Sequence, residues 1–314
     1  MARPPVLAVD VGGTSFKAAL VGPDGGFHSV ESQPTEGSQG EAAYQRLEAF
    51  IAGMLARTGE TPPAAIGLIC PGMEEASGCV LFAANLGWRD FPLGARLGSR
   101  FGLAVAGGHD VRTAGLAEWR LGAAKGETDA AMVMIGTGIA GAFIANGAMI
   151  NGARQMACEI GHVPIYPGGE ACACGQFGCL ETYASASAIA RRYRAAGGVE
   201  GLTAAGIAGR LDRDAVAARI WQEAVEALSI ALATITFMLD PAVIIIGGGL
   251  AEAGEVLLRP LDAALRRRLA WREPPLLRAS ALGQRGVLLG AAIRAWESLG
   301  EETEMGQGFA LPGF

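Results

Sequence analysis

The chain has 314 residues, of which 51% are hydrophobic and 18% are charged, so it is long enough for two ordinary domains with separate cores. Its formal net charge of -6 argues against a nucleic-acid partner held by a basic surface. The N-terminus meets Asp10 before an apolar run of signal-peptide length, and glycines interrupt the uncharged stretch 130–153. We therefore expect a cytoplasmic protein without a membrane partner.

The first predicted element is a strand at 6–9 that enters a glycine turn. This turn holds Asp10, Gly12, Gly13 and Thr14, and strand character resumes after it. A strand, a glycine turn and a second strand present bare backbone N–H groups and a hydroxyl to an anion. The turn is therefore a candidate phosphate-binding hairpin, and an ordinary glycine-rich β-turn is the alternative.

An aspartate at a strand end is the candidate acid for chemistry. The elements predicted around it are helices at 41–57 and 111–121 and strands at 65–69, 78–82 and 103–106. Asp110 follows the last of these strands and precedes the second helix. Because ligands bind at the carboxyl ends of strands in open α/β sheets, Asp110 could accept a substrate proton there. The alternative is that Asp110 only caps the helix.

A second glycine turn follows the strand predicted at 131–135. The run from Gly136 to Gly141 matches G-x-G-x-x-G, but a dinucleotide fingerprint must open a helix, and 142–150 is strand-like. We therefore predict a second hairpin of the same kind. The repeat of this pattern suggests an internal duplication, with two domains that face each other across a cleft.

Four residues of a Gly- and Pro-rich segment form a candidate metal site. His162, Cys172, Cys174 and Cys179 are separated by nine, one and four residues, and Cys3His is a standard zinc shell. Four protein ligands fill the coordination, so this would be a structural zinc. Separate buried cysteines or a disulfide loop are the alternatives, and Cys158 could displace one ligand.

Two acids, Glu159 and Glu181, bracket the metal segment. If zinc fixes the backbone between them, both carboxylates become fixed acceptors for a hydroxyl-rich ligand.

The remaining predicted elements complete the second domain. They are a helix at 181–196, a long helix capped by Asp212 that ends near Leu239, a strand at 242–246, a helix opened by Gly247–Gly249, a last helix at 290–299 and a tail at 301–314. Glycines at a strand–helix junction let a ring or a phosphate lie close to the backbone. Tight packing of a helix on a strand is the alternative.

Two motifs carry a family resemblance. Residues 159–162 read E-I-G-H and residues 172–181 read C-A-C-G-Q-F-G-C-L-E. With the glycine hairpins, they resemble the ROK family of sugar kinases and repressors from Val6 to about Leu299. The resemblance implies an α/β actin-like ATPase (ribonuclease H-like) fold, duplicated, with a cleft between its domains. The expected domains are 1–115 with a C-terminal helix at about 290–300, and 116–289 with a zinc loop at 158–181.

The resemblance also implies roles for individual residues. Asp110 would be the catalytic base. The sugar site would be lined by Gly72, Asn85, His109, Asp110, Glu159, His162 and Glu181. The nucleotide, with Mg2+ near Asp10, would be bound by Asp10, Gly12, Gly13, Thr14, Gly136, Thr137, Gly138, Gly247, Gly248 and Gly249. Zinc would be bound by His162, Cys172, Cys174 and Cys179.

One departure from the family pattern concerns the residue before the base. Relatives usually carry Glu-Asn-Asp where this chain has Gly108-His109-Asp110. The base is kept and its amide neighbour is an imidazole, which bears on the identity of the sugar.

The function implied is an ATP-dependent hexose kinase that phosphorylates the 6-hydroxyl of glucose or N-acetylglucosamine. A kinase for N-acetylmannosamine, mannose or fructose is the alternative. Less favoured are a sugar-responsive repressor, since only five residues precede Val6, and an actin-like ATPase without a small substrate. The resemblance implies a homodimer.

Overall fold

The structure is a computed structural model that describes residues 4–59 and 61–300. It forms two compact units. Unit 1 takes in the chain up to Leu121 and again from Gln284 onwards, and unit 2 is Gly122–Gly283. The boundary predicted at residue 115 falls inside a helix that continues to Leu121. The predicted tail at 301–314 lies outside the described residues.

Unit 1 is built on a five-stranded sheet in the order β3-β2-β1-β4-β7. These strands are β1 (Val6–Val11), β2 (Ser15–Val21), β3 (Phe27–Pro34), β4 (Ala65–Ile69) and β7 (Ala104–Gly108). The first three are antiparallel neighbours, and β4 and β7 run parallel to β1. A separate two-stranded sheet pairs β5 (Val80–Ala83) with β6 (Trp88–Phe91).

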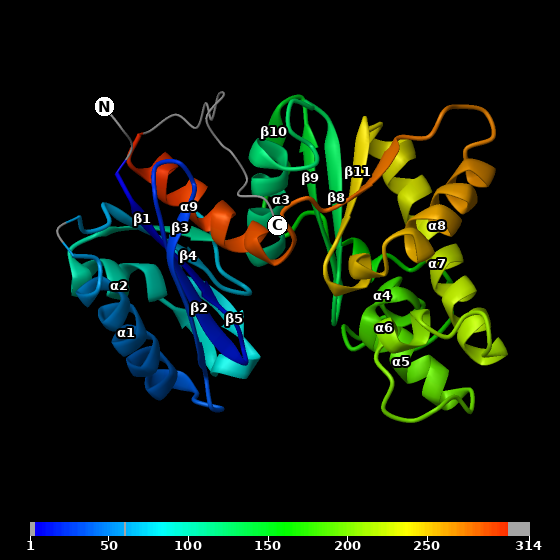
Figure 1. The fold of residues 1–314 in the computed structure, drawn as a ribbon, viewed down its shortest axis with the longest axis horizontal. Coiled ribbons are helices and arrows are strands. Elements are labelled where there is room, and N and C mark those ends of the chain that lie inside the picture. Colours follow the sequence, from blue (N-terminus) through cyan, green and yellow to red (C-terminus); the bar gives the residue numbers. More distant parts are fainter. Residues whose placement is uncertain (1–3, 60, 301–314) are drawn as a thin grey trace. The chain divides into compact units, whose positions relative to one another are not determined.

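Helices cover both faces of this sheet (Figure 1). They are α1 (Gly40–Ala56), α2 (Leu93–Phe101), α3 (Asp110–Leu121) and α9 (Gly286–Ser298). Alternate residues of a strand point to opposite faces: Leu7 and Val9 share a core with α1, whereas Val6 and Ala8 share one with α9. Helix α9, near the end of the chain, therefore packs on one face of the sheet to which the first strand, β1, belongs.

Unit 2 repeats the arrangement with the strand order β10-β9-β8-β11-β12. Its strands are β8 (Ala130–Ile135), β9 (Ile139–Ala145), β10 (Ala148–Met149), β11 (Val243–Gly247) and β12 (Leu276–Ala279). The first three are again antiparallel and the last two parallel to β8, which confirms the predicted duplication. Ile135 pairs with Ile139 across the glycine turn, so the second hairpin is also confirmed.

The helices of unit 2 form its core with one face of the sheet. They are α4 (Glu181–Ala184), α5 (Ala186–Ala195), α6 (Ala204–Ala208), α7 (Ala215–Leu239) and α8 (Glu255–Arg268). Among the described residues, α7 alone is long and apolar enough to cross a membrane by length and composition. Much of it is buried in the core beside α8 and α5, as is usual for the central helix of a globular domain.

Several predicted helix boundaries differ from the structure, and the last helix begins at Gly286 rather than at residue 290. The helix expected at 181–196 breaks at Ser185, whose side chain caps α5 by accepting the N–H of Ala188. The cap of α7 is Asp214 rather than Asp212, because the Asp214 carboxylate accepts the N–H groups of two first-turn residues. Gly249 opens a 3-10 helix, η3 (Gly249–Ala253), and the α-helix starts only at Glu255.

Candidate functional site

In unit 1, the predicted acids lie at the carboxyl edge of the parallel strands. Asp10 of β1 is opposite Ile69 of β4, and Ile69 is opposite Gly108 of β7, two residues before Asp110. Burial raises the pKa of Asp10 to about 6, with a further rise from the charge of Asp110 against a lowering by Lys17. Asp110 therefore lies close enough for its charge to raise the pKa of Asp10.

Asp110 is the first residue of α3, and the N-cap position belongs to His109, whose carbonyl accepts the N–H of Thr113 at 2.9 Å. The Oδ1 atom of Asp110 accepts the N–H of Val111 at 2.8 Å and lies 3.1 Å from His109 Nδ1. Its side chain is 40% exposed. The carboxylate thus contacts the start of the helix and remains open to a ligand, so its role as base stays a prediction.

The imidazole of His109 is the less exposed member of this pair, at 20%. Its Nδ1 is buried, and despite its closeness to Asp110 it has no aligned hydrogen bond within the described part of the chain. Because buried polar atoms normally have a hydrogen-bond partner, this nitrogen is an exception within the site.

The first hairpin packs against the segment that carries Asn85. A Cβ atom on Gly13 would lie 2.8 Å from Asn85 Nδ2, so only glycine allows this approach. The turn itself is closed by Gly12 N–H, which donates to Ser15 O at 3.0 Å, and Thr14 is exposed beside it. Gly72 has φ +68, and a Cβ there would lie 2.2 Å from the carbonyl oxygen of Phe82.

In unit 2, two glycine loops are neighbours at the carboxyl edge of the second sheet. The parallel strands β8 and β11 pair Met134 with Gly247, and a Cβ on Gly248 would lie 2.4 Å from Ile135 O. By contrast, a Cβ on Gly136 or on Gly249 would meet nothing within 4 Å. Gly248 therefore serves tight packing, while the other two glycines present bare backbone to open space.

The four predicted metal ligands gather in one cluster. The ligand atoms of His162, Cys172, Cys174 and Cys179 all lie within 4.8 Å of one another. Both the Cys172 Sγ to His162 Nδ1 distance and the Cys174 Sγ to Cys179 Sγ distance are 3.7 Å. Atoms about 2.3 Å from a central ion in tetrahedral geometry lie roughly 3.8 Å apart, so the cluster fits such an ion. Cys158 is not part of it.

The metal segment holds the second hairpin from two sides. Glu181 Oε2 accepts the N–H of Ile139 at 2.8 Å, and a Cβ on Gly138 would lie 2.5 Å from the same oxygen. From the other end of the segment, the carbonyl of Cys158 accepts the N–H of Gly141 at 2.9 Å. The sequence placed Glu181 in a sugar site, and its hydrogen bond to the hairpin was not foreseen.

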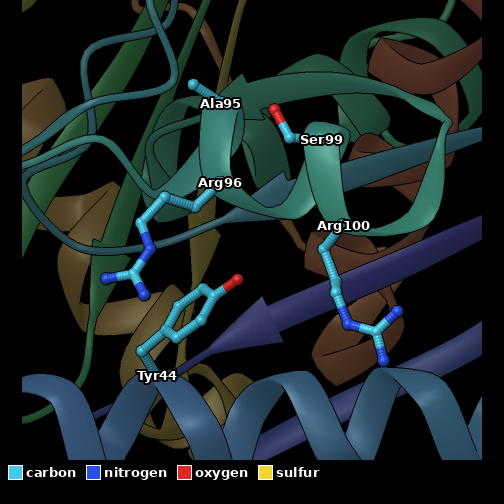
Figure 2. Close-up of a pocket in the computed structure, with 5 residues that line it drawn as sticks. All are labelled: Tyr44, Ala95, Arg96, Ser99 and Arg100. Atoms are coloured by element: carbon cyan, nitrogen blue, oxygen red, sulfur yellow. The ribbon is translucent and has the colours of Figure 1, made fainter.

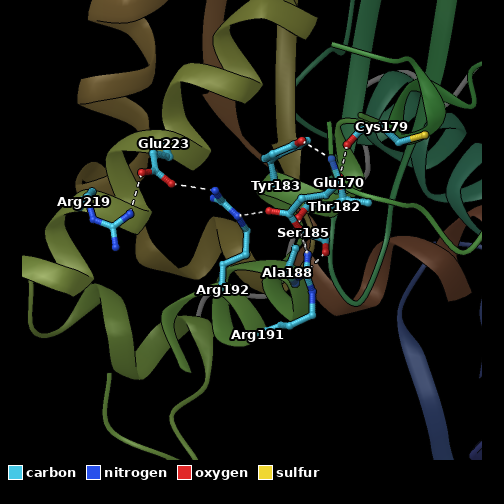
Figure 3. Close-up of polar contacts among 10 residues, drawn as sticks. All are labelled: Glu170, Cys179, Thr182, Tyr183, Ser185, Ala188, Arg191, Arg192, Arg219 and Glu223. Carbon is cyan, nitrogen blue, oxygen red and sulfur yellow. Dashed lines mark hydrogen bonds and ion pairs between the residues drawn. The ribbon is translucent and has the colours of Figure 1, made fainter. Parts of the chain in front are cut away.

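A charged network ties the same segment to helices α5 and α7 (Figure 3). Glu170 accepts hydrogen bonds from Arg191 at 2.7 Å and from Arg192 at 2.9 Å, and Arg192 also donates to Glu223 at 2.8 Å. The backbone N–H of Glu170 donates to the Tyr183 hydroxyl at 2.7 Å. These bonds restrain the loop between the first and second metal ligands. Glu159, at the start of the segment, is half-buried.

A surface pocket of about 440 Å³ lies between α1 and α2, away from the predicted residues (Figure 2). Its lining includes Tyr44, Arg96 and Arg100. Both arginines already have carboxylate partners, since Arg96 pairs with Glu41 at 2.7 Å and Arg100 with Glu48 at 2.6 Å. None of the predicted site residues lines this pocket.

Known proteins resemble this chain along nearly its whole length. The profile of the ROK family matches residues 6–297. A glucokinase of Halalkalibacterium halodurans is 35% identical over 81% of this chain and 83% of its own. An N-acetylmannosamine kinase of Escherichia coli O157:H7 is 32% identical over 92% and 97%. A solved ROK family glucokinase of Streptomyces griseus, in complex with glucose and AMPPNP, superposes with a TM-score of 0.79 at 30% identity, covering 93% and 99%.

Proposed function

Since the chain belongs to the ROK family, we propose that it transfers the γ-phosphoryl group of MgATP to the 6-hydroxyl of a hexose, glucose or N-acetylglucosamine. It is an ATP-dependent sugar kinase, as its glucokinase and N-acetylmannosamine kinase relatives indicate. N-acetylmannosamine is the second candidate sugar, because a kinase for it is 32% identical over most of both chains. A kinase that uses ATP as its donor is consistent with a cytoplasmic location. The homodimer stays a prediction.

The observation that carries this proposal is the carboxyl edge of the first sheet, where Asp110 accompanies Asp10 and the first hairpin. Asp110 would accept the proton of the sugar 6-hydroxyl as that oxygen attacks the γ-phosphorus in line. The partly exposed carboxylate is open to such a hydroxyl. The neighbouring imidazole of His109, which is 20% exposed, would contact a second hydroxyl and so contribute to the choice of sugar.

Phosphoryl transfer requires mainly positioning and neutralisation of charge. The N–H groups of the two hairpins, at Gly12–Thr14 and Gly136–Gly138, would hold phosphate oxygens. The Gly247–Gly249 loop would lie against the adenosine. Mg2+ near Asp10 would neutralise phosphate charge, and a carboxyl whose pKa is raised to about 6 gains a counter-charge when a cation binds.

We assign zinc to the metal cluster because a Cys3His set with these spacings suits tetrahedral zinc. The ion would fix the backbone between Glu159 and Glu181, whose carboxylates would accept sugar hydroxyls. Elemental analysis of the purified protein should find about one zinc per chain. The Cys174→Ser variant should lose most of it and the control variant Cys79→Ser should not; equal zinc contents in both would contradict the assignment.

A coupled assay for ADP with a panel of sugars tests the activity. The panel is glucose, N-acetylglucosamine, N-acetylmannosamine, mannose, fructose and 6-deoxyglucose. We expect one hexose to raise ADP formation about a hundredfold or more over the rate without sugar. The 6-deoxy analogue, which lacks the accepting oxygen, should instead inhibit. ADP formation that no sugar changes would indicate a simple ATPase and would overturn the proposal.

A further inference from the structure

Three segments of unit 1 that are distant in sequence meet at the side chain of Glu75. This residue lies in the connection between β4 and β5. Arg112 of α3 donates from Nε to Glu75 Oε1 at 2.9 Å, and Arg294 of α9 pairs with Glu75 Oε2. The Glu75 and Arg112 side chains are only 9% and 3% exposed. The result is a carboxylate held between two guanidinium groups and largely out of water.

A contribution to the stability of the fold does not by itself explain this nearly buried cluster of charges. Taking charges out of water costs free energy that their attraction only partly returns, and well-packed apolar side chains often stabilise a fold as well or better. What a nearly buried ion pair with directed hydrogen bonds does provide is a single geometry for the groups that it joins.

Those segments carry predicted site residues. Arg112 belongs to the first turn of α3, two residues after Asp110, and Glu75 follows Gly72 in the same connection. The start of α3 is also pressed against α9, because a Cβ on Gly290 would lie 2.0 Å from the carbonyl oxygen of Thr113. One carboxylate thus joins the turn that holds the candidate base to the loop that holds a candidate sugar contact.

We propose that Glu75 is a positioning residue for phosphoryl transfer, which fixes the first turn of α3, and with it Asp110, relative to the connection that carries Gly72. The inference rests on the proposed function for its kinetic consequence. Its structural consequence, a tethered start of α3, is independent of turnover. Since misplacement of a reacting group by about 1 Å can cost a hundredfold in rate, loss of the tether should appear in kcat.

The test compares Glu75→Gln with Glu41→Gln, which removes the charge of an exposed ion pair elsewhere in unit 1. At a temperature where both variants are folded by circular dichroism, Glu75→Gln should lower kcat roughly ten- to a hundredfold. Its KM for the sugar should rise, its KM for ATP should stay within about twofold, and Glu41→Gln should match the wild type. A kcat of folded Glu75→Gln within about twofold of the wild type would overturn the proposal.

A double variant separates positioning from stability. Glu75→Gln with Arg112→Met removes both charges of the most buried pair, which should restore part of any lost resistance to urea. If Glu75 positions Asp110, kcat stays low in this variant. If kcat returns with stability, the role of Glu75 is structural and the proposal fails.

Amide exchange makes the inference testable without turnover. In Glu75→Gln, the amides of Val111, Arg112 and Thr113 should exchange at least about tenfold faster than in the wild type, while amides in the last turn of α3 change little. Unchanged exchange at the start of α3 would contradict the tether. A wild type without sugar-dependent ADP formation would refute the proposed function instead, and the exchange result would still decide whether the tether exists.

Discussion

Two aspartates at the same sheet edge differ in their surroundings. Asp110 has a side chain that is 40% exposed, whereas burial and the neighbouring negative charge raise the pKa of Asp10 to about 6. Between them lies Cys70, whose thiol pKa is raised first by burial and then by the charges of Asp110 and Asp10. The more accessible Asp110 carboxylate suits proton transfer, and the half-buried Asp10 carboxylate suits a cation.

Asp110→Asn tests the proton acceptor. Asparagine keeps the size of the side chain and can still accept the N–H of Val111, but it cannot take up a proton. We expect kcat to fall about a thousandfold, with sugar affinity by calorimetry within a few-fold of the wild type. Asp90→Asn, at an exposed position of β6, is the control. If Asp110→Asn keeps more than a few per cent of the wild-type rate, the base is another group.

Asp10→Asn tests the raised pKa of Asp10. A raised pKa means that the folded chain holds this proton more tightly than the unfolded chain, so the stabilisation is full below pH 3.8 and is lost as the pH rises through about 6. The variant cannot ionise. Its advantage in free energy of unfolding over the wild type should therefore grow from about pH 4 to about pH 7, by up to about 3 kcal/mol.

Urea unfolding at a series of pH values, without magnesium, measures this difference. Added Mg2+ should reduce it, because bound cation stabilises the ionised wild-type carboxyl. A difference between variant and wild type that stays constant over the whole pH range would show that Asp10 has an ordinary pKa in the fold.

Single functional residues could be predicted where residues of one chemical kind stand close together in sequence. The three cysteines and the histidine stand close in sequence, and the cluster confirms that their ligand atoms come together. The triad of Glu75, Arg112 and Arg294 left no such mark, because its members are 37 and 219 residues apart in sequence. The hydrogen bond of Glu181 to the hairpin spans 42 residues and was missed for the same reason.

At the scale of elements, prediction succeeded where apolar periodicity was strong and failed where it was weak or locally interrupted. The buried strand β4 was predicted with its observed bounds, Ala65–Ile69. The helix predicted to open at Gly247–Gly249 begins as α-helix only at Glu255, and it continues through Pro260 to Arg268 although an internal proline normally ends a helix. Strand β12 was missed because three of its four residues are exposed, so the alternation that marks a half-buried strand is absent.

The second hairpin offers a matched pair of glycine variants. A Cβ on Gly138 would lie 2.5 Å from Glu181 Oε2, whereas a Cβ on Gly136 would meet nothing within 4 Å. Gly138→Ala should therefore lower the free energy of unfolding by about 1–3 kcal/mol and weaken sugar binding through Glu181. Gly136→Ala should leave stability within about 0.5 kcal/mol and raise KM for ATP, since the methyl group would occupy the space given to phosphate.

Urea unfolding and the coupled ADP assay measure both effects. If Gly136→Ala binds ATP as the wild type does, the open side of the turn does not hold phosphate. If Gly138→Ala is as stable as the wild type, Glu181 moves without cost and does not support the hairpin.

At the scale of the whole molecule, the duplication could be predicted from the repeat of a strand, a glycine turn and a strand. The domain boundaries could not be predicted in this way. Each unit begins with a strand, a glycine turn and a second strand, and each closes with two parallel strands. The sequence pattern predicted this repeat, and the family resemblance implied the return of the last helix to the first domain. The expected boundary at residue 115 falls inside the helix predicted at 111–121, and the structure keeps that helix, α3, whole with unit 1.

Separate cores in the two units predict separate responses to mutation. Trp296 of α9 is buried in unit 1 and donates from Nε1 to Pro4 O at 2.9 Å, and Trp221 of α7 is buried in unit 2 and donates to Val256 O at 3.2 Å. Replacement of either by alanine should cost its own unit about 3–5 kcal/mol. Peptide-resolved amide exchange in urea should show Trp296→Ala unfolding residues 4–121 and 284–300 early, and Trp221→Ala unfolding 122–283 early. Chelation of the proposed zinc should act like Trp221→Ala, because the four predicted ligands belong to unit 2. If each variant instead made both sets of peptides unfold equally early, the two cores would unfold as one cooperative unit. The packing of α9 on the first sheet would then not stabilise unit 1 separately from unit 2.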